Sequence, residues 1–250
     1  MGAVEPLVMK NSCHKVGKAS KDEAALILQA LSAQAIRQLE RKAKAMGLGE
    51  RILIENASSG LAAVIDALCL GRKALIVAGK GNNGADVLSC GRKLLSRAYD
   101  LTVAIVAQEP LGEEVIFQKS ILEKIRAPLY LINEKNLGEL TLLMEDRDFI
   151  LDGILGIGVK GEVSSFLKNV ITVINEGNKK IVSCDIPSGL SPDTGVVCGA
   201  AIKADYTVSF LAPKQGFFLA DGRRHCGKIF IVDIGISRQV LESKNCIVPF

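Results

Sequence analysis

The sequence predicts an α/β protein: a three-layer α/β/α sandwich built around a Rossmann-like, mostly parallel sheet. Short apolar runs typical of buried strands alternate with segments of helical period from residue 74 to residue 185. Several of these runs are continuously apolar, as expected for strands that are covered on both faces. The chain has 250 residues, of which 48% are hydrophobic, enough for one sizeable core.

The composition excludes several classes of protein. The net charge of +4 is too small to indicate binding to nucleic acid or to an anionic membrane. No apolar run reaches the length of a transmembrane helix, and residues 1–20 lack the apolar core of a signal peptide. Seven cysteines without a C-x-x-C pair, and only two histidines, argue against zinc and for reduced thiols. We therefore expect a cytoplasmic protein, and an organellar transit peptide stays open.

The N-terminal part divides into an arm and the start of the domain. Residues 1–28 are expected to form an arm and the beginning of a helix, and residues 29–250 a single domain. Apolar residues recur at helical spacing between Lys21 and Met46, and Gly47 follows as a stop signal. A second apolar helix runs to about Leu70, with small residues at 57–60 near its expected start.

The central stretch of the sequence is Ala74–Val87. Five apolar residues predict a strand, three glycines (Gly79, Gly81 and Gly84) predict a turn, and helical spacing resumes at Asp86. Glycines at such a turn allow backbone N–H groups to approach a phosphate at a helix N-terminus. The spacing matches neither G-x-G-x-x-G nor the Walker A pattern, so an ordinary βα turn is the alternative interpretation.

The remaining elements follow in alternation. Strands are expected at residues 101–106, 129–132, 149–151 and 181–184, and helices at 112–126, 136–145 and 163–176. Two further strands, at 206–210 and 229–232, have no long helix between them and suit an extension at the sheet edge.

Polar residues follow three of these strands. Asn82, Asn83 and Asp86 follow the first, Asp152 the second, and Asp185 with Ser188 the third. Ligands of open parallel sheets bind at the carboxyl ends of strands, so these groups are expected in one crevice. Each alone is equally typical of a helix cap or a turn.

Several segments in order resemble the YjeF N-terminal domain family, the NAD(P)H-hydrate epimerases. The similarity runs from about Leu31 to about Ile236. The matching segments are Ile54–Ala57, Gly79–Asp86, Asp152–Glu162, the Asp-Ile-Pro-Ser-Gly signature at Asp185–Gly189, Lys203–Val208, Ala212–Gly216 and Asp233–Ile236.

The resemblance implies an isomerase of nicotinamide nucleotide repair, which interconverts the R and S forms of hydrated NADH and NADPH (NADHX and NADPHX). It implies one potassium ion per subunit, held by Asn83, Asp152 and Ser188, and oxygen ligands suit such a hard cation. Asp185 and Lys160 are the candidate catalytic acid and base, with their roles left open. The residues expected to bind the substrate are Asn82, Asn83, Gly84, Ala85, Asp86, Gly156, Ile157, Gly158, Val159, Lys160, Gly161, Glu162 and Asp185.

Two departures and two alternatives accompany the resemblance. Ala85 and Val87 stand where the family usually has glycine, and we expect them to narrow the approach to the ligand. Members of the family are often fused to a dehydratase. We expect the dehydratase here to be a separate polypeptide that acts downstream of this protein. We also expect this protein to form a homodimer. The alternatives are a non-catalytic binding or dimerisation module, like that of RNA-decapping scaffolds, and a secreted protein-interaction role.

Overall fold

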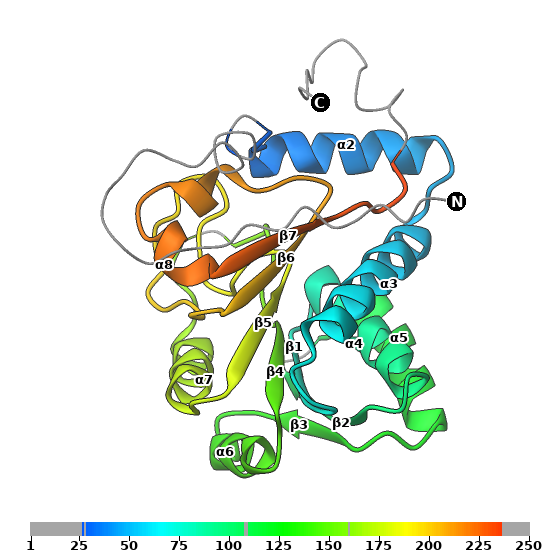
Figure 1. Ribbon diagram of the computed structural model, residues 1–250, viewed down its shortest axis with the longest axis vertical. Coiled ribbons are helices and arrows are strands. Elements are labelled where there is room, and N and C mark those ends of the chain that lie inside the picture. The colour runs from blue at the N-terminus through cyan, green and yellow to red at the C-terminus, as the bar shows by residue number, and fades with distance from the viewer. Residues whose placement is uncertain (1–26, 28, 108–109, 160, 237–250) are drawn as a thin grey trace.

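The computed structural model describes residues 27, 29–107, 110–159 and 161–236. They form a three-layer α/β/α structure around one seven-stranded sheet, which confirms the predicted fold class (Figure 1). Every strand pairs in parallel with its neighbours, in the order β3-β2-β1-β4-β5-β6-β7. The strands are β1 (Lys73–Ala78), β2 (Asp100–Val106), β3 (Leu129–Ile132), β4 (Phe149–Gly153), β5 (Lys180–Cys184), β6 (Tyr206–Phe210) and β7 (Lys228–Val232).

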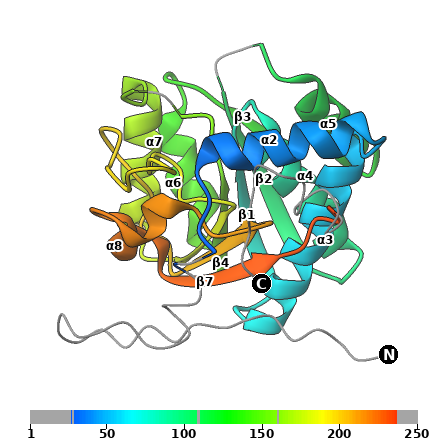
Figure 2. The same ribbon diagram turned by 90° about the horizontal axis from the view of Figure 1, so that it is seen from above.

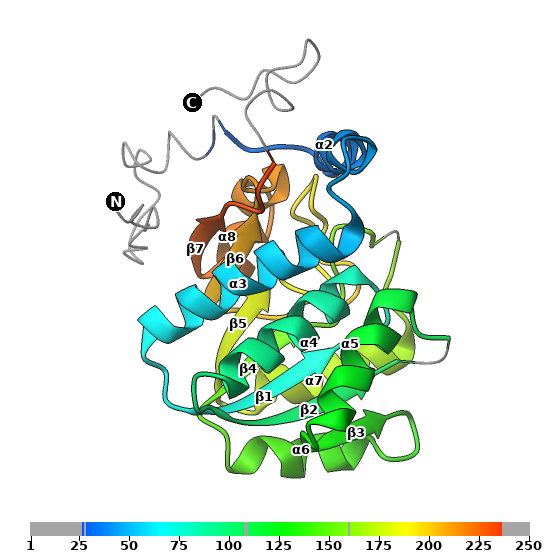
Figure 3. The same ribbon diagram turned by 90° about the vertical axis from the view of Figure 1, so that its right-hand side faces the viewer.

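Helices cover both faces of the sheet because its strands are apolar on both sides. One face packs against α3 (Glu50–Leu68), α4 (Asn82–Leu95) and α5 (Glu113–Lys124), and the other against α6 (Leu137–Glu145) and α7 (Ser165–Glu176) (Figures 1 and 3). Two shorter helices, η1 (Gln215–Phe218) and α8 (Gly222–Cys226), lie between β6 and β7.

The strand order reverses at β1, which pairs with β2 on one side and β4 on the other. The chain leaves β1 and β4 at adjacent positions, since Ala78 is in register with Gly153. Loops that turn to opposite faces at such a point leave a crevice at the carboxyl ends of the strands. Helix α2 (Ala33–Ala45) crosses over this end of the sheet (Figure 2).

Three helix boundaries differ from the sequence-based expectation. Helix α2 begins at Ala33, where the side chain of Ser32 accepts a hydrogen bond from the Ala35 N–H (3.2 Å). Leu31 therefore lies outside the helix and instead forms an isolated bridge with Lys214. Helix α3 runs unbroken from Glu50, so the small residues at 57–60 lie within it. Helix α4 begins at Asn82, earlier than the expected Asp86.

Most of the expected N-terminal arm, residues 1–26 and 28, lies outside the described residues, so the boundary between residues 28 and 29 stays a prediction. None of the helices within the described ranges is long and apolar enough to cross a membrane. The five cysteines in those ranges are free thiols, namely Cys69, Cys90, Cys184, Cys198 and Cys226.

Gly60 lets α3 approach the sheet edge. A Cβ atom at Gly60 would lie 2.0 Å from Cγ1 of Val232, which is buried on β7. We expect Gly60→Ala to lower the free energy of unfolding by about 1–3 kcal/mol, the cost of overpacking. Urea denaturation measures this change, and Val232→Ala in the same chain is expected to restore most of the loss.

Gly138→Ala is the matched control. Gly138 lies in α6 with no atom within 4 Å of an added Cβ. Here alanine is expected to raise stability by up to about 1 kcal/mol through helix propensity. Equal stabilisation by both substitutions would contradict close packing at Gly60.

Candidate active site

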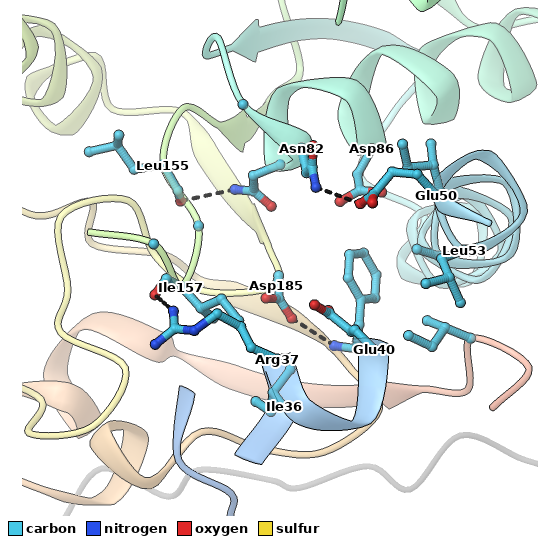
Figure 4. A pocket seen from close by; sticks show the side chains of 18 of the residues that line it. Ile36, Arg37, Glu40, Glu50, Leu53, Asn82, Asp86, Leu155, Ile157 and Asp185 are labelled. Atoms are coloured by element: carbon cyan, nitrogen blue, oxygen red, sulfur yellow. Dashed lines mark hydrogen bonds between the residues drawn. The ribbon is translucent and has the colours of Figure 1, made fainter. Parts of the chain in front are cut away.

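A cavity of about 430 Å³ opens at the carboxyl ends of the strands (Figure 4). Its walls come from α2, α3 and α4 and from the segments that follow β1, β4, β5, β6 and β7. The cavity lies at the switch point between β1 and β4, where open α/β sheets bind their ligands.

The loop after β1 and the first turn of α4 are packed so tightly that Gly79 and Gly84 cannot be replaced without displacing backbone. A Cβ atom at Gly79 would lie 1.8 Å from the Ile154 carbonyl oxygen, and one at Gly84 would lie 2.0 Å from the Gly79 carbonyl oxygen. The loop leads into α4, whose N-cap is Gly81 and which has no side-chain cap. The first N–H groups of an uncapped helix, with its dipole, favour an anion such as a phosphate.

Ala85 and Val87 do not narrow the cavity, contrary to the expectation from the sequence. Both side chains are fully buried in the core beneath α4. Val87 fills the space beside Gly153, where an added Cβ would lie 2.4 Å from its methyl groups. Helix geometry turns these two positions toward the sheet while Asn82, Asn83 and Asp86 line the cavity.

Asn83, which lines the cavity, is linked to the buried residues Asp152 and Ser188. Ser188 donates to Asp152 through its hydroxyl (2.5 Å) and its N–H (3.0 Å). The Leu155 peptide joins the third residue to this pair, because its N–H donates to the Ser188 hydroxyl (2.8 Å) and its carbonyl accepts from the Asn83 amide (2.9 Å). The three strand ends that the sequence singled out are thus linked in space.

Asp152 is a buried carboxylate without a cationic partner among the described residues. It is fully buried and accepts hydrogen bonds from neutral groups only, including the Ser183 hydroxyl (2.8 Å) and the Ile154 N–H (3.2 Å). Burial raises the pKa of Asp152, and the hydrogen bonds from Ser188 and Ser183 partly oppose this rise. Buried carboxylates are usually paired with a cation or coordinate a metal ion, so this arrangement suits a bound cation.

Asp185 projects into the cavity from the end of β5, with its backbone in the left-handed region (φ 62°). Its carboxylate accepts a hydrogen bond from the Phe210 N–H (3.0 Å) and forms an ion pair with Lys214. Lys214 is itself fully buried, and its ammonium group also donates to the Ser209 hydroxyl (2.8 Å). These contacts fix the direction of the Asp185 side chain.

Three further carboxyl groups face the same cavity: Asp86 from α4, Glu40 from α2 and Glu50 from α3. Burial raises the pKa of Asp86 well above its ordinary value, and the negative charges of Asp185 and Glu40 add to the rise. Burial and Asp185 also raise the pKa of Glu40. Glu50 accepts a hydrogen bond from the Asn82 amide (2.5 Å) and forms an ion pair with Lys44.

The structure brings most, but not all, of the expected site residues to the cavity. Those that line it are Asn82, Asn83, Asp86, Gly156, Ile157, Gly158, Val159 and Asp185. Gly84 and Ala85 are buried and do not line the cavity. Glu162 is exposed and forms an ion pair with Lys168 (2.6 Å). Gly161 is not among the lining residues, and Lys160 lies outside the described residues.

Sequence reasoning missed three residues at this site. Arg37 and Glu40 lie outside the apolar stripe of the first predicted helix, yet α2 turns both toward the cavity. Arg37 donates to the Ile157 carbonyl (3.0 Å) and so joins α2 to the loop after β4. Lys214 lies in the Ala212–Gly216 segment, and its place just after a buried strand was the available signal.

Comparison with known proteins agrees with the family resemblance of the sequence. The family model for the YjeF-related protein N-terminus matches residues 50–216. A crystal structure of the yeast protein ynu0 superimposes with a TM-score of 0.65 at 24% identity, covering 75% of this chain and 82% of that one.

Three curated relatives illustrate the similarity in sequence. An NAD(P)H-hydrate epimerase of Elusimicrobium minutum is 34% identical over 86% of this chain and 99% of its own length. One of Rhodopirellula baltica is 30% identical over 87% of this chain and 88% of its own. A bifunctional NAD(P)H-hydrate repair enzyme of Moorella thermoacetica is 32% identical over 78% of this chain but only 38% of its own length.

The buried carboxyl group of Asp86 predicts an unusual pH dependence of stability. Because its pKa is raised in the folded protein, the folded state holds this proton to higher pH than the unfolded state. The contribution of Asp86 to stability therefore falls as pH rises from about 4, the ordinary pKa of Asp, toward the folded pKa. We expect the melting temperature of Asp86→Asn to exceed that of the parent increasingly between pH 4 and pH 8.

Glu162→Gln serves as the control of opposite sign. The ion pair with Lys168 lowers the pKa of Glu162, so any effect of this substitution is a small loss of stability above the ordinary pKa of Glu. A melting-temperature difference between Asp86→Asn and the parent that stays constant with pH would contradict the raised pKa.

Proposed function

This chain belongs to the YjeF-related N-terminal family, and we propose that its strand-end cavity is the place where it interconverts the R and S forms of hydrated NADH and NADPH. The chain is an isomerase of the NAD(P)H-hydrate epimerase type, as its relatives of matching length indicate. Asn83, Asp152 and Ser188 are all present and in mutual contact through Leu155, which disfavours the alternative of a non-catalytic binding module.

The observation that supports the site most strongly is the fixed carboxylate of Asp185 inside the cavity. The hydrated substrate carries a hydroxyl group on a carbon next to the ring nitrogen. Inversion at this carbon requires the oxygen to leave and a water to return on the other face, so protons must be given and taken. We assign Asp185 as the base that accepts a proton from the incoming water. Lys160 stays a candidate for the acid.

The distribution of charge suggests how the nucleotide lies. The carboxyl groups Glu40, Glu50, Asp86 and Asp185 line the cavity, and phosphate groups would be repelled beside them. Residues 156–159 and the uncapped N-terminus of α4 also line the cavity and offer backbone N–H groups. We therefore place the phosphates there and the hydrated ring beside the carboxyl groups.

A potassium ion held by Asn83, Asp152 and Ser188 is part of this proposal. The donor set consists of an amide, a carboxylate and a hydroxyl oxygen, which suit a hard cation. The buried charge of Asp152 supports the fit, because no described residue supplies the opposite charge. The ion would supply positive charge that holds the loops after β4 and β5 in place. Asn83, Asp152 and Ser188 also position Asp185, because only a short segment of chain joins Asp185 to Ser188.

The partners follow from the chemistry. The bifunctional relatives join a similar segment to a longer chain, and this chain spans about two fifths of their length. We propose that a dehydratase acts on the epimer that this protein delivers. A homodimer and a cytoplasmic location are the remaining expectations, and the free cysteines suit a reducing compartment.

Asp185→Asn tests the catalytic role. Asparagine keeps the shape of the side chain but cannot accept the proton, so turnover is expected to fall by about 10²–10⁴-fold. Conversion of the R to the S form, followed by chiral chromatography, measures this rate. Nucleotide affinity, measured by calorimetry, is expected to change little.

A thermal melt of Asp185→Asn is the necessary control, because the substitution also removes the partner of the buried Lys214. A folded variant that epimerises close to the parent rate would show that Asp185 only shapes the turn.

Potassium dependence tests the cation site. We expect the melting temperature of the parent to be higher in potassium chloride than in choline chloride at equal ionic strength, because a ligand of the folded state stabilises it. The difference should be lost in Asp152→Asn and reduced in Asn83→Ala. Identical melting temperatures and turnover of the parent in the two salts would contradict the assignment.

A further inference from the structure

Asp86 is a buried carboxyl group with no described partner. Its side chain lines the cavity, and the residue is only 9% exposed. Among the residues that the structure describes, none donates a hydrogen bond to its carboxyl group or forms an ion pair with it. An isolated buried carboxylate is costly, whereas the neutral acid is tolerated and has a proton to give.

The surroundings of Asp86 favour the neutral form of its carboxyl group. Glu40 on α2, Glu50 on α3 and Asp185 after β5 all place negative charge around it. The ammonium group of Lys214 opposes them, but it is already paired with Asp185. The described titratable and charged groups around Asp86 or along the cavity are Glu40, Glu50, Asp185, Lys214, Arg37, Lys80, Cys90 and Cys184.

The four carboxyl groups are not a metal centre. Among the residues that the structure describes, no group of three or more acidic, histidine or cysteine side chains is arranged to hold a metal ion. Asp86 and Asp185 approach the same space from different elements, α4 and the end of β5 (Figure 4). A pair of carboxyl groups in different environments is the usual arrangement for an acid and a base that act together.

We propose that Asp86 is the proton donor to the departing hydroxyl group, acting across the hydrated ring from Asp185. This inference rests on the proposed function and adds a residue with a defined role to it. Asp86 stands among the residues that the family resemblance implies for substrate binding, but binding alone does not require an unpaired buried acid.

The proposed step balances in protons and electrons. The proton of Asp86 moves to the hydroxyl oxygen, the carbon–oxygen bond breaks, and the ring nitrogen lone pair forms a carbon–nitrogen double bond as water leaves. A water on the opposite face then attacks this carbon, the double-bond electrons return to nitrogen, and Asp185 takes a proton from the water. Asp86 ends ionised and Asp185 protonated, and exchange with solvent restores both.

The four carboxyl groups of the cavity suit the intermediate of this step, which carries a positive charge on the ring. Glu40 and Glu50 also line the cavity and would stabilise that charge as it forms. Glu40 has a second effect as a positioning residue, since its charge favours the protonated form of Asp86.

The test is the pH profile of epimerisation of hydrated NADH by the parent, Asp86→Asn and Glu40→Gln. Asp86→Asn is expected to remain folded and to lose about 10²–10³-fold in kcat, with KM changed by no more than a few-fold. Glu40→Gln is expected to lower kcat less than Asp86→Asn does, and its activity should decline at a pH lower than in the parent, by about half a unit or more. Glu123→Gln, on the exposed side of α5, is the control and should match the parent.

The outcomes separate this inference from the proposed function. A parent protein that does not interconvert the two epimers would overturn both. A parent that does so while Asp86→Asn is equally active, or raises KM alone, would overturn only the role of Asp86. If the decline of activity at alkaline pH is unchanged in Glu40→Gln and is absent in Lys160→Met, the proton donor is Lys160 instead.

Discussion

The carboxylate of Asp152 accepts hydrogen bonds from the Ser183 hydroxyl on β5, from the Ile154 N–H after β4, and from both the hydroxyl and the N–H of Ser188. These contacts join the carboxyl ends of β4 and β5 and the loop beyond them. Because Ser188 lies three residues after Asp185, the same contacts limit where Asp185 can point. A buried charge of this kind stabilises the fold only while its partners stay in place, so the site and the fold depend on the same residues.

The cavity combines two chemically different kinds of group. Acidic side chains from α2, α3, α4 and the end of β5 line it, and the uncapped N-terminus of α4 and the glycine-rich segment after β4 offer backbone N–H groups. An anionic nucleotide whose ring becomes cationic during the reaction would be oriented by the positions of these groups. Burial and the negative charges of Asp185 and Glu40 favour the neutral form of Asp86, and Asp185 itself is paired with Lys214.

Helix α2 completes the cavity although it lies before the residues that the family model matches. Its position is fixed at both ends and in the middle: the Ala33 N–H donates to Asp193 (2.6 Å), Arg37 donates to the Ile157 carbonyl, and Lys44 pairs with Glu50. Ile36, Arg37 and Glu40 then cover the strand ends. The chemistry of the cavity therefore depends in part on a segment whose sequence signal was simply that of an amphipathic helix.

The sequence by itself determined the class of fold, the alternation of elements and the family, because buried strands, glycine turns and helical spacing are local patterns. It also indicated that Asn83, Asp152, Asp185 and Ser188 belong near one another, since the carboxyl ends of parallel strands meet at one edge. The tertiary structure alone decided which groups face the ligand. Ala85 and Val87 turn into the core because α4 begins at Asn82, and Lys214 reaches Asp185 because β6 lies beside β5. Glu40 places its negative charge near Asp86 because α2 crosses this end of the sheet, and proximity of this kind between distant segments has no periodicity from which it can be predicted.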